Sequence, residues 1–152
     1  MFDKIFVAVD GSKDSYRAVE IGINMAKKFG CHITFVYVST RDYIEKLYGD
    51  ESKIKKSVSP FDDFLLEQAR TEEIGLKVFQ KIKEIVDKED HNKFETKMLS
   101  GKPSEQILNE INSWEYDLVI VGRHGASKAQ KALFGSATEP LLTKAKIPVM
   151  IV

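Results

Sequence analysis

The 152-residue chain carries 23 Lys and Arg residues against 23 Asp and Glu residues, and 43% of it is hydrophobic. This balance is ordinary for one globular domain and argues against a general nucleic-acid binder or membrane-surface binder. A single cysteine, Cys31, cannot form an internal disulfide, and no apolar stretch approaches the ~20 residues of a membrane span. We therefore expect one cytoplasmic domain over residues 1–152, without nucleic-acid or membrane partners.

The first part of the chain predicts two buried strands with a helix between them. Residues 5–9 and 33–38 are continuous apolar runs of strand length, which is typical of strands buried in a parallel sheet. Between them, apolar residues recur at spacings of three and four, as on the buried face of a helix. Ser12 is suited to cap the start of this helix, and Gly30 is suited to end it.

A polar segment, residues 40–60, interrupts this pattern. It is mixed in charge, weakly periodic and closed by Pro60. We predict a long loop with one short helix there, because loops of this length in compact domains are usually functional or disordered. A helix is expected to follow over residues 61–88, where apolar residues again recur at helical spacing.

The second half of the chain predicts three more strands and two more helices. The strands are residues 94–99, 118–121 and 148–152. One helix begins at Gly101-Lys-Pro103, with the proline near its first position, and the other runs from Ser136 to about Lys144. Pro140 lies one turn into this last helix, where it cannot donate an N–H to the Ser136 carbonyl.

Strands and helices thus alternate along the whole chain. This alternation predicts an open parallel five-stranded sheet with helices on both faces and right-handed crossovers. We predict a Rossmann-like α/β fold with the strand order 3-2-1-4-5. Ligands of such sheets bind beyond the carboxyl ends of the strands, where the strand order reverses.

The segment after the fourth strand is the best candidate for such a site. It reads Gly122-Arg-His-Gly125, then nine residues, then Gly135-Ser136, whereas the usual phosphate motifs, GxxxxGK[ST] and GxGxxG, are absent. Glycines let the backbone approach a ligand closely and adopt conformations forbidden to other residues. Amides there, and at the start of a helix, can bind phosphate. Ser136-Ala-Thr-Glu139 also matches a capping box, in which the first and the last side chain bind backbone amides at the start of a helix. This role would account for Ser136 and Glu139 without a ligand.

This spacing, Gly-2X-Gly-9X-Gly-(Ser/Thr), resembles the signature of the ATP-binding branch of the universal stress protein family. The opening strand with Asp10-Gly-Ser12, the Gly101-Lys-Pro103 turn and the ending Ile147-Pro-Val-Met-Ile-Val152 are similar to that family as well. The resemblance covers the whole chain. Arg123 departs from it, because the family often has serine there, and so does Ala126, where arginine or lysine is frequent.

The resemblance implies that ATP binds, with Mg²⁺ or Mn²⁺ accompanying it. Asp10 would contact the ribose and phosphate region, Val9, Val38 and Val121 would flank the adenine, and the glycine segment would hold the phosphates. The alternative role of Asp10 is a turn or a cap at the start of the first helix. The complete set of expected nucleotide-binding residues is Ala8, Val9, Asp10, Val38, Val121, Gly122, Arg123, Gly125, Gly135, Ser136 and Ala137.

Three functions are compatible with the sequence. The first is an ATP-binding stress-response regulator that switches or binds an unknown protein partner, with residues 40–60 as a candidate surface. The second is a slow Mg²⁺- or Mn²⁺-dependent ATPase or nucleotidyl-transferring enzyme that uses Asp10, although no catalytic base is evident. The third is a nucleotide-independent dimeric interaction module. The family dimerises through its last strand, so the resemblance implies a homodimer through the strand from Val149 to Val152.

Overall fold

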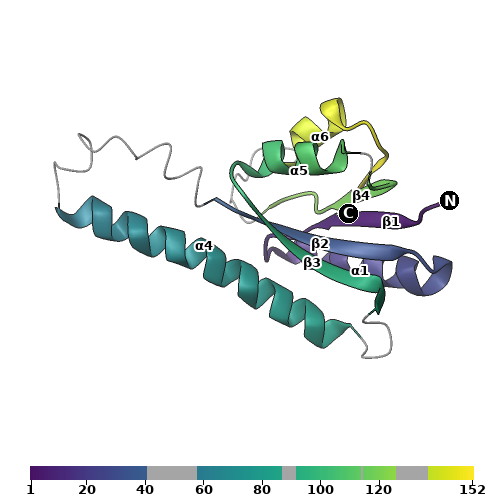
Figure 1. Ribbon diagram of the computed structural model, residues 1–152, viewed down its shortest axis with the longest axis horizontal. Helices are drawn as coiled ribbons and strands as arrows, with labels where there is room; N and C mark the ends of the chain where they lie inside the picture. Colours follow the sequence, from purple (N-terminus) through teal and green to yellow (C-terminus); the bar gives the residue numbers. More distant parts are fainter. Residues whose placement is uncertain (41–57, 87–91, 114, 126–136) are drawn as a thin grey trace.

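The fold is seen in a computed structural model of the chain, shown in Figure 1. The structure describes residues 1–40, 58–86, 92–113, 115–125 and 137–152, and between 58 and 71 it describes only the course of a helix. The elements follow in the order β1 (Lys4–Ala8), α1 (Lys13–Phe29), β2 (His32–Ser39), α4 (Val58–Ile85), β3 (Phe94–Ser100), α5 (Pro103–Ile111), β4 (Leu118–Val121), α6 (Thr138–Lys144) and β5 (Val149–Ile151).

The five strands form one parallel sheet in the order β3-β2-β1-β4-β5. The predicted fold class and strand order are therefore confirmed. Strand β1 lies at the centre, with Ile5 in register with Ile33 of β2 and Leu118 of β4. The amides of Asp3 and Lys4 donate to the Asp117 carboxylate at 2.7 and 2.9 Å, which ties the start of β1 to the start of β4 and lowers the pKa of Asp117.

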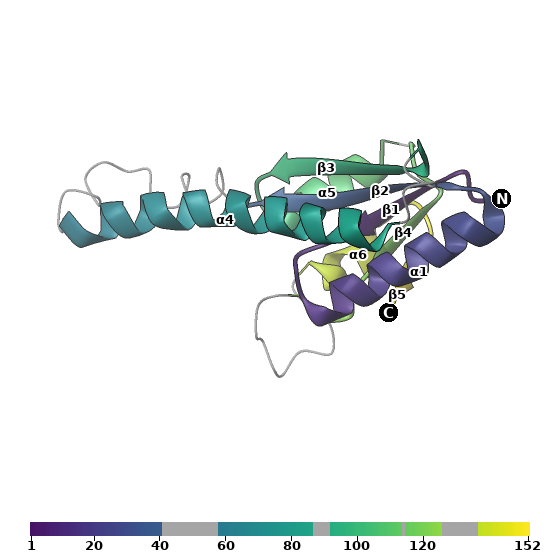
Figure 2. The same cartoon turned by 90° about the horizontal axis from the view of Figure 1, so that it is seen from below.

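Helices cover both faces of the sheet, α1 and α4 on one and α5 and α6 on the other (Figures 1 and 2). Alternate residues of β1 divide between the two resulting cores, because successive strand side chains point to opposite faces. Ile5 and Val7 pack toward α1 and α4, whereas Phe6 packs toward α5. Nothing among the helices of the described residues combines the length and apolar character of a membrane span.

Both ends of helix α1 are capped as the sequence predicts. The Ser12 side chain accepts the Ser15 amide at its start, and Gly30 closes it with a left-handed φ of 76°. Its buried face carries Ala18, Val19 and Ile23. The small Gly22 lets this face lie close to the sheet, since a Cβ there would come within 3.1 Å of Val7 Cγ2.

Helix α4 begins earlier than expected, at Val58 instead of residue 61, so Pro60 does not close a loop. A proline is tolerated there because the amides of the first helical turn have no partner within the helix. Most of the predicted loop, residues 41–57, lies outside the described residues. The C-terminal half of α4 packs over β2 through Val78 and Ile82, while the other half extends past the sheet (Figure 2).

The last helix and strand are shorter than the sequence predicts. Helix α6 begins at Thr138 with Ala137 as its N-cap and no side-chain cap, so the predicted start at Ser136 is wrong. Pro140 is consequently the third residue of α6, where its missing N–H costs no helical hydrogen bond. Strand β5 spans Val149–Ile151 and lies at the edge of the sheet.

Candidate functional site

A cavity of about 290 Å³ opens at the carboxyl ends of β1, β2 and β4, next to the point where the strand order reverses. This is where open parallel sheets bind their ligands. The described residues that line it are Ala8, Val9, Asp10, Ser12, Ser15, Val36, Tyr37, Val38, Thr40, Pro103, Ile107, Val121, Gly122, His124, Gly125, Ala137 and Thr138.

The lining combines an apolar wall with a polar rim. The wall comes from strand ends and from α5, with Val38, Ile107 and Val121 all less than one-tenth exposed. The rim comes from the turns that follow the strands and carries a carboxylate, hydroxyls and an imidazole. Small-molecule sites typically have this composition, a mainly apolar enclosure with a few oriented polar groups.

Asp10 stands where β1 gives way to α1. Its Oδ1 accepts the Ser12 amide at 2.9 Å, so the carboxylate does hold a turn, as the alternative interpretation of the sequence proposed. Gly11 makes that turn with a φ of 83°, in the left-handed region that favours glycine. The other oxygen, Oδ2, faces the segment after β4, because a Cβ built on Gly125 would lie 2.8 Å from it.

The lack of room for a side chain, and not an unusual backbone conformation, explains why glycine stands at positions 122 and 125 after β4. Among the described glycines, positive φ angles occur at Gly11, Gly30 and Gly101, so the expectation of forbidden conformations is wrong for Gly122 and Gly125. A Cβ at Gly122 would come within 2.8 Å of the Asp14 carbonyl carbon and 2.9 Å of the Ser15 amide nitrogen. The end of β4 therefore lies directly on the backbone of the first turn of α1.

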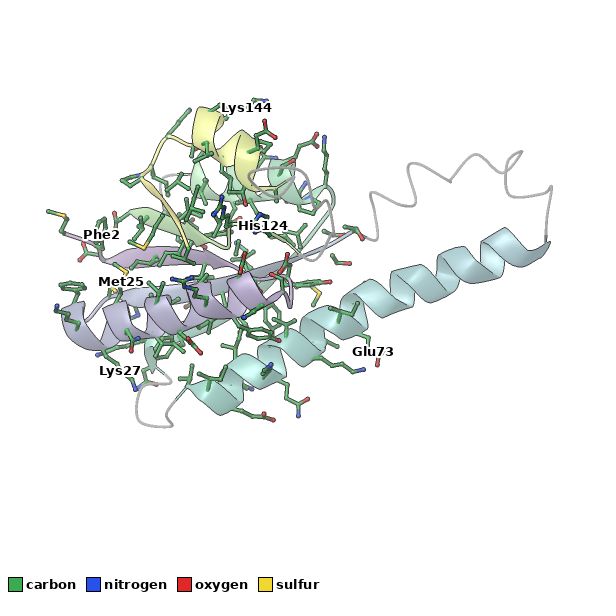
Figure 3. All side chains as sticks on the ribbon, turned by 180° about the vertical axis from the view of Figure 1, so that it is seen from behind. Phe2, Met25, Lys27, Glu73, His124 and Lys144 are labelled. Carbon is green, nitrogen blue, oxygen red and sulfur yellow. The ribbon has the colours of Figure 1, made fainter. Side chains whose placement is uncertain are left out.

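The first turn of α1 and the segment 122–125 are also joined by hydrogen bonds. Asp14 Oδ2 accepts the His124 amide at 3.1 Å and lies 3.2 Å from His124 Nδ1. The Ser12 hydroxyl donates to the His124 carbonyl at 3.4 Å. Figure 3 shows His124 at the end of α1 opposite to Met25 and Lys27. Thr138 Oγ1 holds Gly122 from the other side, donating to its carbonyl at 3.1 Å.

Known proteins share both the sequence pattern and this fold. The sequence model of the Universal stress protein family matches residues 1–152. The chain belongs to the universal stress protein family. It is 27% identical over 152 residues to the universal stress protein YxiE of Bacillus subtilis, an alignment that covers 100% of this chain and 99% of YxiE.

Two solved structures share the universal stress protein fold at low sequence identity. The universal stress protein UspA from Lactobacillus plantarum superposes with a TM-score of 0.73 at 17% identity, covering 99% of this chain and 97% of its own. A family member from Arabidopsis thaliana, solved with AMP bound, superposes with a TM-score of 0.62 at 18% identity, covering 99% and 90% of the two chains.

Most of the predicted binding residues of this universal stress protein lie together at the cavity. The structure brings there Ala8, Val9, Asp10, Val38, Val121, Gly122, Gly125 and Ala137. Arg123 is not among them, and its amide donates to the Val152 carbonyl at 2.8 Å, beside β5. Gly135 and Ser136 lie outside the described residues.

Several lining residues were missed by reasoning from the sequence. Ile107 comes from the middle of α5, and Ser15 and Thr138 come from the first turns of α1 and α6. Two further lining residues, Thr40 and Pro103, follow the ends of strands, where the sequence already predicts a ligand site. The others face the cavity through tertiary packing, which no local pattern encodes.

The charge of Asp10 acts on two tyrosines across the α1 and α4 side of the sheet. Burial raises the pKa of the Tyr37 hydroxyl, and the Asp10 carboxylate raises it further. The same two causes, in the same order, raise the pKa of Tyr16. Tyrosine hydroxyls are uncharged near neutral pH, and both shifts extend the uncharged range to higher pH.

Proposed function

We propose that this universal stress protein binds ATP in the cavity and serves stress response as a nucleotide-dependent regulator. The observation that carries the proposal is the close approach of Asp10 to Gly125 at the polar rim of a cavity with an apolar wall. Family membership and the AMP-bound relative from Arabidopsis support the same ligand class. The stress-response role rests on the family and on the names of its members.

The cavity matches the chemical parts of an adenine nucleotide. Adenine is a flat, largely apolar ring, and the wall of Val38, Ile107 and Val121 offers it a surface of the same kind. Ribose hydroxyls can donate to a carboxylate, and Asp10 stands between the wall and the glycine segment. The volume of about 290 Å³ is at the lower end of the roughly 300–1,000 Å³ of small-molecule sites, so the nucleoside part would be enclosed. The phosphates would then extend past Gly122 and Gly125.

A divalent cation would depend mainly on the nucleotide itself. Within the described residues, no group of three or more His, Cys, Asp or Glu side chains is arranged to hold a metal ion. Magnesium commonly binds through one or two carboxylates together with substrate phosphates and water. Asp10 lines the cavity and fits the carboxylate part of that donor set, so Mg²⁺ or Mn²⁺ would enter with the triphosphate and supply charge neutralisation there.

Equilibrium titration with ATP tests the proposal, with Gly125→Trp as the blocked variant. Even the Cβ of the new residue would lie 2.8 Å from Asp10 Oδ2, so a bulky side chain there must displace the carboxylate at the mouth of the cavity. We expect saturable binding to the unsubstituted protein and at least a tenfold weaker affinity in the variant, the loss expected from about 1.4 kcal/mol or more. Equal and weak binding to both proteins would refute the proposal.

We further propose that the protein forms a symmetric homodimer through β5. This strand is an edge of the sheet, and its Val149, Met150 and Ile151 are only partly covered within the chain. An exposed edge is a template for pairing with another chain. A symmetric interface brings the same position of both copies together, so Val149→Lys would add two like charges to it.

Sedimentation of the Val149→Lys variant tests the dimer. Leu142→Lys is the matched control, because Leu142 is 45% exposed on α6 and does not belong to the edge strand. We expect the control to sediment as a dimer and the edge variant as a folded monomer. A dimer of unchanged stability in Val149→Lys would exclude the edge-pairing arrangement.

A further inference from the structure

The ring of His124 is oriented by a side chain that the nucleotide proposal has not used. Asp14 Oδ2 is shared between the His124 amide, at 3.1 Å, and the His124 ring nitrogen Nδ1, at 3.2 Å. Asp14 belongs to the 17-residue helix α1, and its backbone lies against Gly122. One carboxylate oxygen on a regular helix therefore fixes both the main chain and the imidazole of the residue between the two cavity glycines.

The Asp14 contact determines which ring nitrogen remains available. A carboxylate can only accept, so Nδ1 carries the shared proton and Nε2 points away from Asp14. The structure gives Nε2 no hydrogen-bond partner among the described residues. The His124 side chain is 49% exposed and lines the cavity beside Gly125. Nε2 is thus a polar atom at the rim, held in a fixed direction and open to a ligand.

We propose that His124 is a phosphate-recognising residue of the cavity and that Asp14 is its positioning residue. This inference rests on the proposed nucleotide function. Phosphate oxygens only accept, so the contact uses the imidazolium form, in which Nε2–H donates. In that arrangement the Asp14 carboxylate lies on the Nδ1 side of the ring, and the phosphate would lie on the Nε2 side. Asp10 lines the same cavity, and its Oδ2 faces Gly125.

His124 would differ from the apolar wall in the part of the ligand that it contacts. The apolar wall acts on the adenine, so it contributes equally to the binding of adenosine and of ATP. His124 meets only the phosphates, so it contributes to ATP alone. The ratio of ATP affinity to adenosine affinity therefore reports His124, and a purely structural role of the Asp14–His124 contact would change both affinities together.

Equilibrium binding of ATP and of adenosine to His124→Asn tests the inference. The asparagine amide can still donate to Asp14 from a position close to that of Nδ1, whereas nothing replaces Nε2. We expect ATP affinity to fall about tenfold, as for the loss of one charge-assisted hydrogen bond, with adenosine affinity unchanged within twofold. Asp14→Asn should lower the ratio in the same direction and by a smaller factor. His32→Asn is the control, because His32 is exposed at the start of β2.

Binding of both ligands distinguishes a wrong assignment of His124 from an absence of nucleotide binding. Equal losses for ATP and adenosine in His124→Asn would overturn the phosphate assignment and indicate a structural latch. Unchanged ATP affinity in a variant with an unchanged melting temperature would overturn it as well. Unsubstituted protein that binds neither ligand would refute the nucleotide function itself, and the role of His124 with it.

Discussion

Asp10 and Gly125 lie in contact across the mouth of the cavity, although one follows β1 and the other follows β4. Any side chain at position 125 would place its Cβ 2.8 Å from Asp10 Oδ2. The partner oxygen, Oδ1, is already held by the Ser12 amide, so the carboxylate cannot rotate away without losing that bond. The glycine thus leaves room for the aspartate, and the pair defines the polar end of the cavity.

A double-mutant cycle on this pair measures the contact. Gly125→Ala should weaken ATP binding by about three- to tenfold, because the methyl group displaces the Asp10 carboxylate from its position. In an Asp10→Ala background the same substitution should have little further effect, since the clashing oxygen is gone. Titration calorimetry of the four proteins gives the coupling. Independent, additive losses would contradict the contact.

Gly30→Ala is the matched control for this cycle. Gly30 has a φ of 76° and nothing within 4 Å of the position that a Cβ would take. Alanine is strained in that conformation, so the free energy of unfolding should fall by about 1 kcal/mol while ATP affinity stays the same. Gly125 is not among the glycines with a positive φ, so Gly125→Ala should show the opposite pattern, a loss of affinity with little loss of stability.

The close approach of α4 to the sheet makes a second prediction. A Cβ at Gly75 would come within 2.6 Å of Tyr37 Cδ1 and 2.7 Å of Met98 Cε, whereas at Gly22 of α1 the nearest contact would be 3.1 Å. Helix propensity alone favours alanine over glycine by about 1 kcal/mol at both positions. We expect overpacking to dominate at Gly75, with Gly75→Ala destabilising the protein by about 1–3 kcal/mol and Gly22→Ala by less. Urea unfolding of both variants checks the order, and a more stable Gly75→Ala protein would contradict the packing of α4.

The ionisation of Tyr116 should lower the stability of the protein at alkaline pH. Its ring is buried against Phe6, and its hydroxyl donates to Glu110 at 3.2 Å. Burial is the main cause that raises the pKa of Tyr116 to about 12, with the Glu110 charge adding to it. A pKa that is higher in the folded state stabilises the fold fully below the unfolded pKa, about 10, and this contribution is lost as the pH rises toward 12.

Unfolding measured at about pH 9, 10 and 11 tests this linkage, because these pH values bracket the ordinary pKa of tyrosine. The free energy of unfolding should fall steadily over the upper part of this range. In Tyr116→Phe the fall should be smaller, while the stability at pH 9 drops by about 1 kcal/mol for the lost hydrogen bond. Equal slopes in both proteins would show that Tyr116 is not the group responsible.

The sequence predicted the sheet well because each strand is an apolar run bounded by turn residues. The centre of the sheet, for example, follows from residues 5–9 and 118–121, whose two apolar faces require helices on both sides. The caps of α1 were predictable for a similar reason, since Ser12 and Gly30 act on their own neighbours. Local chemistry determines such features.

The candidate site was predictable only in part, because its geometry depends on contacts between distant residues. Asp14 and His124 are separated by 110 positions, and no local pattern pairs them. The role of Gly122 was misjudged for the same reason, since the atoms that exclude a side chain there belong to α1. The start of α4 was predicted at the wrong residue because a proline such as Pro60 is found both in loops and in the first turn of a helix.

Amide chemical shifts recorded during an ATP titration would show where on the protein the nucleotide binds. A rival position exists in the groove between α1 and α4, which Lys13, Arg17 and Lys81 line. We predict that the amides of Asp10, Val38 and Gly122 shift in a saturable way, while Thr96 on the far edge strand does not. Shifts confined to the α1–α4 groove, or no shifts at saturating ATP, would contradict the account.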